Sequence, residues 1–171
     1  SERYGFINGV IRTSDGDSIP EERFGEHLEH VVLPYSQGSA YKREGKAYMV
    51  GALSRMNLAK DLLHKNTKEA IGTTLDLFPS IDVYRNNLAQ AIEILHAIDD
   101  SLEILQTEKI VSEPVIKGQN RDAEGVGVVE APRGTLYHKV RLASTGMVTS
   151  GEVVVPTGQN QINIEEDIAR L

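Results

Sequence analysis

The sequence predicts an α+β fold that is mainly helical, with a small antiparallel β unit at about residues 126–156. The first observation is a run of apolar residues between Ser80 and Lys109 whose spacings alternate between three and four, as in a helix-bundle seam. The second is a set of valine-rich runs after Gly125, which are typical of strands. The third is the composition, 40% hydrophobic and 25% charged, which is that of an average globular domain. We therefore expect a mainly helical part over residues 1–125, followed by the β unit.

The first predicted helix follows a turn at residues 14–17, where Ser, Asp, Gly and Asp favour chain reversal. Pro20 suits the first turn of a helix, and Pro34 is expected to end it. Between the two prolines, apolar residues recur at helical spacing: Phe24, Leu28, Val31 and Val32. The polar, glycine-bearing stretch 37–47 predicts a loop, and a second helical region is expected over residues 48–65.

The strongest helical pattern lies at about residues 80–109. Ser80 is a candidate N-cap because it follows Pro79, and a helix over the whole stretch would be about 45 Å long. Its apolar positions are Leu88, Ile92, Leu95, Ile98, Leu102 and Leu105. The polar residues Asp99, Asp100 and Ser101 leave open a second interpretation, in which the stretch forms two helices.

The β unit is predicted from apolar runs that start at Val126, Leu136 and Val153. Gly146 and Gly151 are expected to bracket the reversal between the last two strands, because glycine favours tight turns. We expect the unit to extend to about residue 160.

A capping box is predicted near the carboxyl end, because Asn163 is followed three residues later by Glu166. A helix is therefore expected to begin there and to cover residues 163–171. Since a helix of that length is marginal alone, we expect the chain to be truncated at its carboxyl end.

The composition excludes several classes of function. A formal charge of -7 and a pI near 5.2 argue against nucleic-acid binding, which depends on clustered Lys and Arg. The chain has no cysteine, so it cannot provide disulfides, iron-sulfur ligands or a cysteine nucleophile. His27 and His30 could share a helix face, but without a third ligand a solvated surface is the better interpretation. The sequence has no membrane-spanning run and no signal-peptide pattern, which favours a cytoplasmic protein.

Two local stretches are candidates for chemistry. In Glu130–Gly134, a proline and a glycine constrain the backbone on both sides of Arg133. The structural alternative is a surface ion pair between Glu130 and Arg133. In Val153–Asn160, an apolar strand could deliver a hydroxyl and then amides to a loop, although the pattern alone favours a buried strand closed by a turn.

Four stretches together resemble the large subunits of nickel-iron hydrogenases. They are Glu130–Leu136 with His138, Val154–Thr157, Tyr48–Leu58 and Asn86–Ala91. They are most similar to the soluble, bidirectional branch of that family, whose members couple to pyridine nucleotides or deazaflavin. The likeness runs in order over essentially the whole chain, so the chain is identified as an internal fragment of such a subunit.

The resemblance implies a metal centre whose ligands lie outside this chain. In the family, hydrogen is split heterolytically at nickel and iron bridged by cysteine thiolates, with cyanide and carbon monoxide on the iron. Those thiolates come from two Cys-x-x-Cys pairs near the two ends of the subunit, and neither pair is present here. We therefore expect a Ni-Fe(CN)2(CO) centre in the intact subunit, but no metal ligand, no cofactor and no activity in this chain alone.

The resemblance also implies roles for five residues. Arg133 matches an arginine that overhangs the two metals, donates to a cyanide and is a candidate base toward hydrogen. Pro132 is expected to line the same wall, and Thr157 matches a position whose hydroxyl donates to the other cyanide. Glu130 is expected to orient the arginine loop, while His138 is assigned an orienting role only.

The function implied is that of the parent subunit, hydrogen oxidation and proton reduction. Its implied partners are an iron-sulfur small subunit and flavin-containing electron-transfer subunits. One alternative is a quinone-reducing subunit of a respiratory complex, which keeps the fold without nickel but departs from the Ala-Pro-Arg-Gly pattern. Another is a non-catalytic scaffold that has lost its cysteines.

Overall fold

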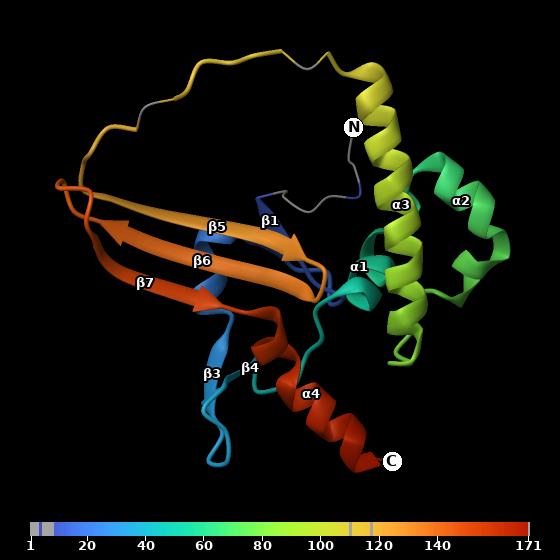
Figure 1. Ribbon diagram of the computed structural model, residues 1–171. Coiled ribbons are helices and arrows are strands. Elements are labelled where there is room, and N and C mark those ends of the chain that lie inside the picture. The colour runs from blue at the N-terminus through green and yellow to red at the C-terminus, as the bar shows by residue number, and fades with distance from the viewer. Residues whose placement is uncertain (1–3, 5–8, 110, 117, 171) are drawn as a thin grey trace.

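The computed structural model describes residue 4 and residues 9–109, 111–116 and 118–170. Its helices are α1 (Ala52–Ala59), α2 (Lys65–Ile71), α3 (Arg85–Thr107) and α4 (Pro156–Arg170), with 3-10 helices η1 (Glu21–Glu26), η2 (Lys60–Leu62) and η3 (Gly72–Leu77). Its strands are β1 (Val10–Arg12), β2 (Ser18–Pro20), β3 (Glu29–Val32), β4 (Ser39–Lys42), β5 (Ala123–Ala131), β6 (Gly134–Leu142) and β7 (Val148–Val154). This mixture of helices and antiparallel sheets confirms the α+β fold class (Figure 1).

The predicted β unit is a three-stranded antiparallel sheet in the order β5-β6-β7. The strands pair from Ala123 opposite Leu142 to Ala131 opposite Gly134, and β7 follows along β6. Gly146 lies in the reversal before β7 with φ +83°, as expected, but Gly151 lies within β7. The sheet ends at Val154, earlier than residue 160, because the chain turns into α4 there.

The helix predicted between Pro20 and Pro34 is wrong. A short 3-10 helix ends at Glu26, and the chain then forms β3, which pairs with β4. The β-branched residues Val31 and Val32 favour this pairing over a helix. β4 lies in the stretch that was predicted to be a loop. His27 and His30 consequently do not share a helix face, since His30 is in β3.

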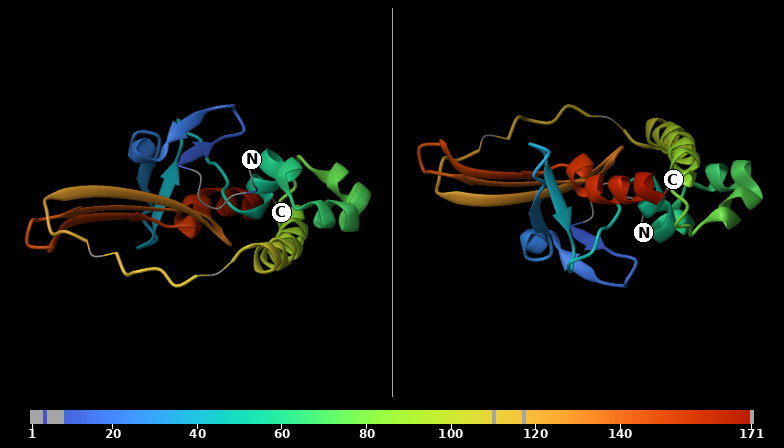
Figure 2. Two further views of the ribbon diagram at one scale, coloured as in Figure 1. Left: turned by 90° about the horizontal axis from the view of Figure 1, so that it is seen from above. Right: turned by 90° about the horizontal axis from the view of Figure 1, so that it is seen from below.

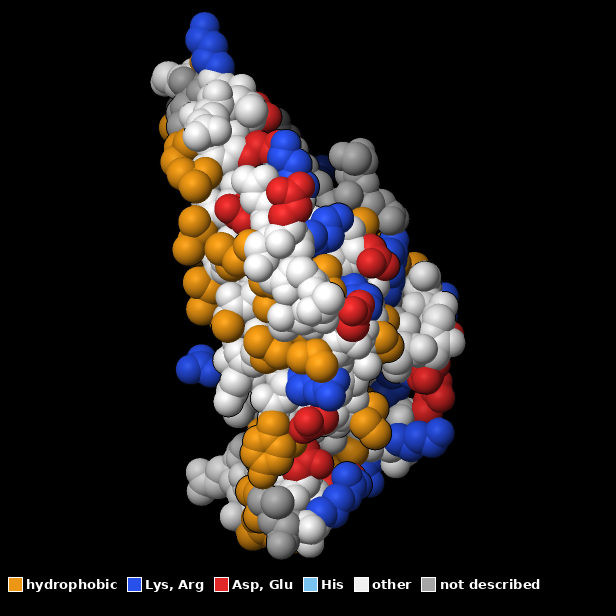
Figure 3. All heavy atoms as spheres, turned by 90° about the vertical axis from the view of Figure 1, so that its right-hand side faces the viewer, with side chains coloured by type: hydrophobic (Ala, Val, Ile, Leu, Met, Phe, Trp, Pro, Cys, Tyr) orange, Lys and Arg blue, Asp and Glu red, His pale blue; other side chains and the backbone are white. Residues whose placement is uncertain are grey.

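The long helix is confirmed as one unbroken element, α3, so the interpretation as two helices is wrong. It begins at Arg85 rather than Ser80. Only its first half supplies buried residues, Ala89, Ile92 and His96, while the later apolar positions of the predicted seam are exposed: Ile98, Leu102 and Leu105. Hydrophobic side chains accordingly show on the side of the molecule where α2 and α3 lie (Figure 3).

The helix at the carboxyl end begins at Pro156, so the capping box at Asn163 is wrong and Asn163 lies in mid-helix. Proline at the first helical position is favourable because its missing N–H is not needed there. The helical region expected over 48–65 begins at Ala52. It consists of two short pieces, α1 and η2, and ends at Leu62. Within the described residues, no helix combines the length and apolarity needed to cross a membrane.

Two apolar clusters hold these elements together. One joins α1, η3 and α3 through Leu53, Met56, Phe78 and Ile92. The other joins the sheet to η1 and β4, where the rings of Phe24 and Tyr137 stack at 4.9 Å. Views from above and below show β1–β4 on one face of the sheet, and the segment between α3 and β5 on the other side (Figure 2). The turn between β5 and β6 lies where the sheet meets α1 (Figure 1).

Candidate functional site

The candidate site is the two-residue turn that joins β5 and β6. Pro132 and Arg133 occupy it, and both are exposed. Gly134 follows with φ +132°, a conformation that L side chains rarely adopt. A Cβ at Gly134 would lie 2.4 Å from Val50 Cγ2 and 3.0 Å from the Gly51 amide nitrogen. The turn therefore depends on glycine for its direct contact with the backbone that precedes α1.

The side chain of Arg55, in α1, fixes the turn through ion pairs and hydrogen bonds. Its side chain is only 9% exposed and pairs with Glu93 of α3 at 2.6 Å and with Glu130 of β5 at 2.5 Å. The same guanidinium group donates hydrogen bonds to two carbonyl oxygens of the turn, Ala131 O at 3.0 Å and Pro132 O at 3.3 Å. One buried cation thus connects two helices and the hairpin.

The carboxylates around Arg55 are themselves held. The hydroxyl of Thr135 donates to Oε1 of Glu130, and the hydroxyl of Tyr4 donates to Oε1 of Glu93 at 2.6 Å. Burial opposes the charge on Arg55, but the hydrogen bonds and charges of Glu93 and Glu130 outweigh it and raise the pKa of Arg55. Burial, together with the charge of Glu93, also raises the pKa of Tyr4. A buried charge with this many partners has a fixed position.

The first turns of α4 hold the hairpin from the other side. The side chain of Asn160 accepts a hydrogen bond from Val50 N at 2.8 Å and donates one to Val50 O at 2.9 Å. It also donates to Arg133 O at 3.5 Å. Gln159, fully buried, donates to Thr135 O at 2.6 Å. The start of α4 and the turn are therefore bonded at the same end of the sheet.

Gly158 allows α4 to approach β4, because a Cβ there would lie 2.4 Å from Ser39 O of β4. Thr157 precedes it with an exposed side chain, in the first turn of α4. The prediction that Thr157 lies in a loop is wrong, since Pro156 already begins the helix. Thr157 nevertheless lies at the same end of the sheet as Arg133.

The remaining predicted residues have different surroundings. Glu130 pairs with Arg55 and Thr135, so the alternative in which it pairs with Arg133 is wrong. His138 is exposed in β6, on the opposite face from the buried Tyr137. The roles assigned to Arg133, Pro132, Glu130, His138 and Thr157 stay predictions.

Sequence reasoning missed Arg55 and Glu93, which fix the turn. It expected the amides of Gln159 and Asn160 to lie in a loop but did not predict that they hold the turn. A pattern for Arg55 was available, because it lies on the same face of α1 as the buried Ala52 and Met56. A charged residue on a buried helix face requires a partner of opposite charge. The partners are 38 and 75 residues away in sequence, so the pattern could not identify them.

The donor set of this end of the sheet suits anions rather than a metal ion. The exposed guanidinium of Arg133 and the exposed hydroxyl of Thr157 can donate hydrogen bonds to an anionic ligand. The chain has no thiolate, and among the described residues no group of three or more His, Asp or Glu side chains could hold a metal. The residues present therefore fit the surroundings of a metal-bound anion and do not themselves form a metal-binding set.

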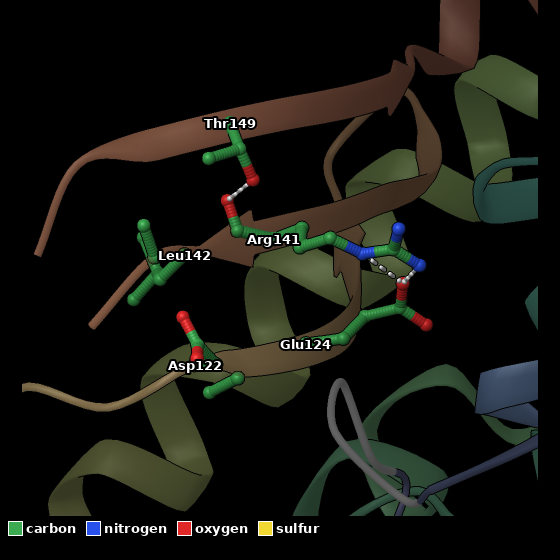
Figure 4. A pocket seen from close by; sticks show the side chains of 7 residues that line it. Asp122, Glu124, Arg141, Leu142 and Thr149 are labelled. Atoms are coloured by element: carbon green, nitrogen blue, oxygen red, sulfur yellow. Dashed lines mark hydrogen bonds and ion pairs between the residues drawn. The ribbon is translucent and has the colours of Figure 1, made fainter.

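A hollow of about 380 Å³ lies at the opposite end of the sheet (Figure 4). It is lined by Asp122, Ala123, Glu124, Arg141, Leu142, Ala143 and Thr149. Of its three charged side chains, Arg141 donates to Glu124 at 2.7 Å, so these two charges offset each other, and Asp122 accepts a hydrogen bond from the Ser144 amide. It contains none of the predicted site residues, and we do not assign it a function.

Comparisons with known proteins agree with the residue-level resemblance. No family model matches the chain. Among curated proteins, it is 31% identical to sulfhydrogenase 1 subunit alpha of Pyrococcus furiosus over 98% of the chain and 39% of that protein. It is 32% identical to the NAD-reducing hydrogenase HoxS subunit beta of Cupriavidus necator over 91% of the chain and 35% of that protein. The chain thus spans well under half of either relative.

Solved structures show the same fold. An NAD+-reducing [NiFe]-hydrogenase in its H2-reduced state matches 94% of the chain and 39% of its own, with a TM-score of 0.69 and 22% identity. The Ni-Fe-Se hydrogenase of D. vulgaris Hildenborough matches 91% of the chain with a TM-score of 0.53 and 18% identity. Because the sequence likeness and the shared fold both extend over nearly all of the chain, it belongs to the nickel-iron hydrogenase family, of whose subunits it spans a part.

Proposed function

We propose that this chain is part of the catalytic large subunit of a nickel-iron hydrogenase, which catalyses reversible oxidation of hydrogen. The observation that carries the proposal is the Ala-Pro-Arg-Gly turn, held by Arg55 on one side and Asn160 on the other. This construction presents one exposed arginine from a fixed backbone. Positioning of this kind is what a site needs when a charged group must meet a reacting centre without reorganisation.

The nickel-iron centre, when bound in the intact subunit, supplies the place at which hydrogen is cleaved. Arg133 and Thr157 then provide donors to its anionic ligands, since a guanidinium and a hydroxyl at one end of the sheet suit two cyanides. Pro132 lines the same wall. Glu130 holds the turn through Arg55, and His138 is left an orienting role from the exposed face of β6.

The metal ligands come from cysteines outside these residues, because thiolates are the ligands such a centre requires. We therefore expect that this chain, purified alone, binds no stoichiometric nickel or iron and is inactive. Elemental analysis checks this directly. About one nickel per chain would overturn the ligand assignment.

The proposed partners are an iron-sulfur small subunit and flavin-containing electron-transfer subunits in the cytoplasm. This proposal is supported by one relative, which is a subunit of an NAD-reducing hydrogenase. Reduction of NAD requires a route by which electrons leave the metals. The test is co-purification of the intact subunit with an iron-sulfur protein and a flavoprotein.

A second candidate function is a non-catalytic scaffold of the same fold, which the absence of cysteine favours. The sequence encoded on both sides of these residues distinguishes the two functions. Cysteine pairs on both sides of these residues support the catalytic subunit, and their absence supports the scaffold.

The experiment that tests the catalytic proposal is Arg133→Lys in the intact subunit with its partners. Lysine keeps the charge but lacks the planar fork that lets one side chain donate in two directions. We expect hydrogen uptake to fall by about 10²–10⁴, the usual range for a positioned acid or base. The cyanide and carbon monoxide infrared bands should persist with small shifts, because no metal ligand has changed.

Near-normal uptake with intact infrared bands would show that Arg133 is structural. Loss of the bands would show instead that Arg133 is needed to assemble the centre. Arg141→Lys is the matched control: it makes the same change at an exposed arginine at the far end of β6, outside the site, and we expect it to leave uptake near the parent's value.

A further inference from the structure

We propose that Arg55 is a positioning residue, which sets the direction of the Arg133 side chain through the backbone of the turn. This inference rests on the proposed function. Among the described residues, Arg55 contacts two largely buried carboxylates and the turn carbonyls. The direct route from Arg55 to Arg133 therefore passes through the backbone of Ala131 and Pro132.

The geometry gives Arg55 control of the turn. Its Nη1 donates to both the Glu130 carboxylate and Ala131 O, and its Nη2 to both the Glu93 carboxylate and Pro132 O. A planar guanidinium with five donors can make these bonds at once, whereas a lysine ammonium has three donors on one nitrogen. The two carbonyls it holds belong to the two residues directly before Arg133.

Arg55 connects the turn to the long helix α3 through Glu93. Glu93 accepts from Nε and Nη2 of Arg55 at 2.6 and 2.7 Å, and its side chain is only 11% exposed. The guanidinium group is therefore held by α3, a 23-residue helix, as well as by Glu130 of the hairpin. Without this connection, the hairpin could move relative to α3. A shift of about 1 Å at a reacting group can lower a rate by roughly 10²-fold.

The first test is Arg55→Lys in the intact subunit with its partners. We expect kcat for hydrogen uptake to fall by about 10- to 100-fold with KM for hydrogen little changed, because binding of hydrogen does not involve the turn. Backbone hydrogen exchange at Gly134, which closes the turn opposite Ala131, should become about tenfold faster, since the turn opens locally. This second readout does not depend on activity. An unchanged kcat or an unchanged exchange rate at the turn overturns the proposal.

The matched control is Arg43→Lys. Arg43 has a side chain that is 13% exposed and pairs with Asp15, Asp17 and Glu44, but it contacts no part of the turn. We expect its kcat and the exchange of the Gly134 amide to stay at the parent's values. If Arg43→Lys lowers kcat as much as Arg55→Lys does, the effect is general destabilisation and the proposal is overturned.

The double variant Arg55→Lys/Arg133→Lys separates positioning from an independent contribution. If Arg55 acts through Arg133, the double variant is no slower than Arg133→Lys alone, because residues that act as a unit are not additive. Rates that multiply overturn the proposal. If Arg55→Lys does not fold, Glu130→Gln takes its place, with a loss of about 3- to 10-fold in kcat and faster exchange at the turn; no change in either overturns it.

The failure of this inference is distinguishable from that of the proposed function. A parent subunit that carries its metals but takes up no hydrogen overturns the proposed function. Hydrogen exchange still decides, in that case, whether Arg55 holds the turn. A parent that takes up hydrogen normally, with Arg55→Lys unchanged in rate and exchange, overturns this inference alone.

Discussion

The two ends of the β5–β6–β7 sheet use the same residue types in different surroundings. At the turn end, Arg55 pairs with Glu93, and the two side chains are 9% and 11% exposed. At the far end, Arg141 pairs with Glu124, and the side chains are 63% and 38% exposed (Figure 4). The first pair is surrounded by helices and backbone, and the second by solvent. Burial, not the presence of an arginine–glutamate pair, therefore distinguishes the end that must hold a fixed geometry.

The largest expected difference between the ends is in the free energy of unfolding. Arg55→Met removes the cation but leaves the Glu93 and Glu130 carboxylates in place, and breaking a buried pair in this way costs about 3–5 kcal/mol. Arg141→Met should change it by less than about 0.5 kcal/mol, because an exposed pair contributes little. Urea unfolding of both variants measures this. Equal losses would show that the two ends do not differ in how their ion pairs contribute to stability.

The second expected difference concerns glycine. Gly134→Ala should lower the free energy of unfolding by about 2–5 kcal/mol, because strain at positive φ adds to a clash with Val50 and Gly51. Gly146→Ala is the control at the far end. It has φ +83°, but its Cβ would meet only the side chain of Asn120, at 3.3 Å, which can move. We expect a loss of about 1–3 kcal/mol from strain alone, and a loss as large as that of Gly134→Ala would contradict the close contact at the turn.

The third expected difference tests the α4 side of the turn. Asn160→Ala leaves the half-buried N–H and C=O of Val50 without their partner, which costs about 1–3 kcal/mol. Asn163→Ala, one turn further along the same helix, removes only a 3.5 Å contact with Asp167 and should cost less than about 0.5 kcal/mol. Thermal unfolding monitored by circular dichroism compares the two. Similar shifts in Tm would show that Asn160 contributes no more than an ordinary surface residue.

The parts of the fold that sequence predicted are those determined by local pattern. The spacing of Leu88, Ile92 and Leu95 predicted α3, and the valine runs predicted the sheet. The helix expected up to Pro34 failed because Val31 and Val32 pair with β4, which a local pattern cannot reveal. The start of α4 failed because two helix signals compete there, and Pro156, not Asn163, begins the helix.

In the candidate site too, local features could be predicted from sequence and long-range contacts could not. The Ala-Pro-Arg-Gly turn could be predicted from sequence because proline and glycine have local conformational preferences. The residues that hold it could not, because Arg55 meets Glu130 across 75 residues of sequence and Asn160 meets Val50 across 110. Such contacts depend on how helices and sheet pack, and a single sequence contains no direct record of that packing.

The smallest expected effect is a pH dependence at the far end. The hydrogen bond from Arg141, and then that from Lys139, hold the pKa of Glu124 below its ordinary value near 4.5. A lowered pKa in the folded state means that the pair stabilises the fold above about pH 4.5 and that this contribution is lost as the pH falls through the folded value. Glu124→Gln removes that contribution, so the parent and the variant should differ slightly in stability at pH 6 and converge as the pH falls through the lowered folded pKa. Salt should have the same effect as acid, because about 1 M NaCl screens exposed charges within roughly 3 Å.

The measurement is urea unfolding of both proteins between pH 3 and 7, at low salt and at about 1 M NaCl. A difference that persists in acid or in salt would mean that Glu124 is not acting through an exposed ion pair, and the contrast between the two ends of the sheet would then be smaller than their exposures indicate.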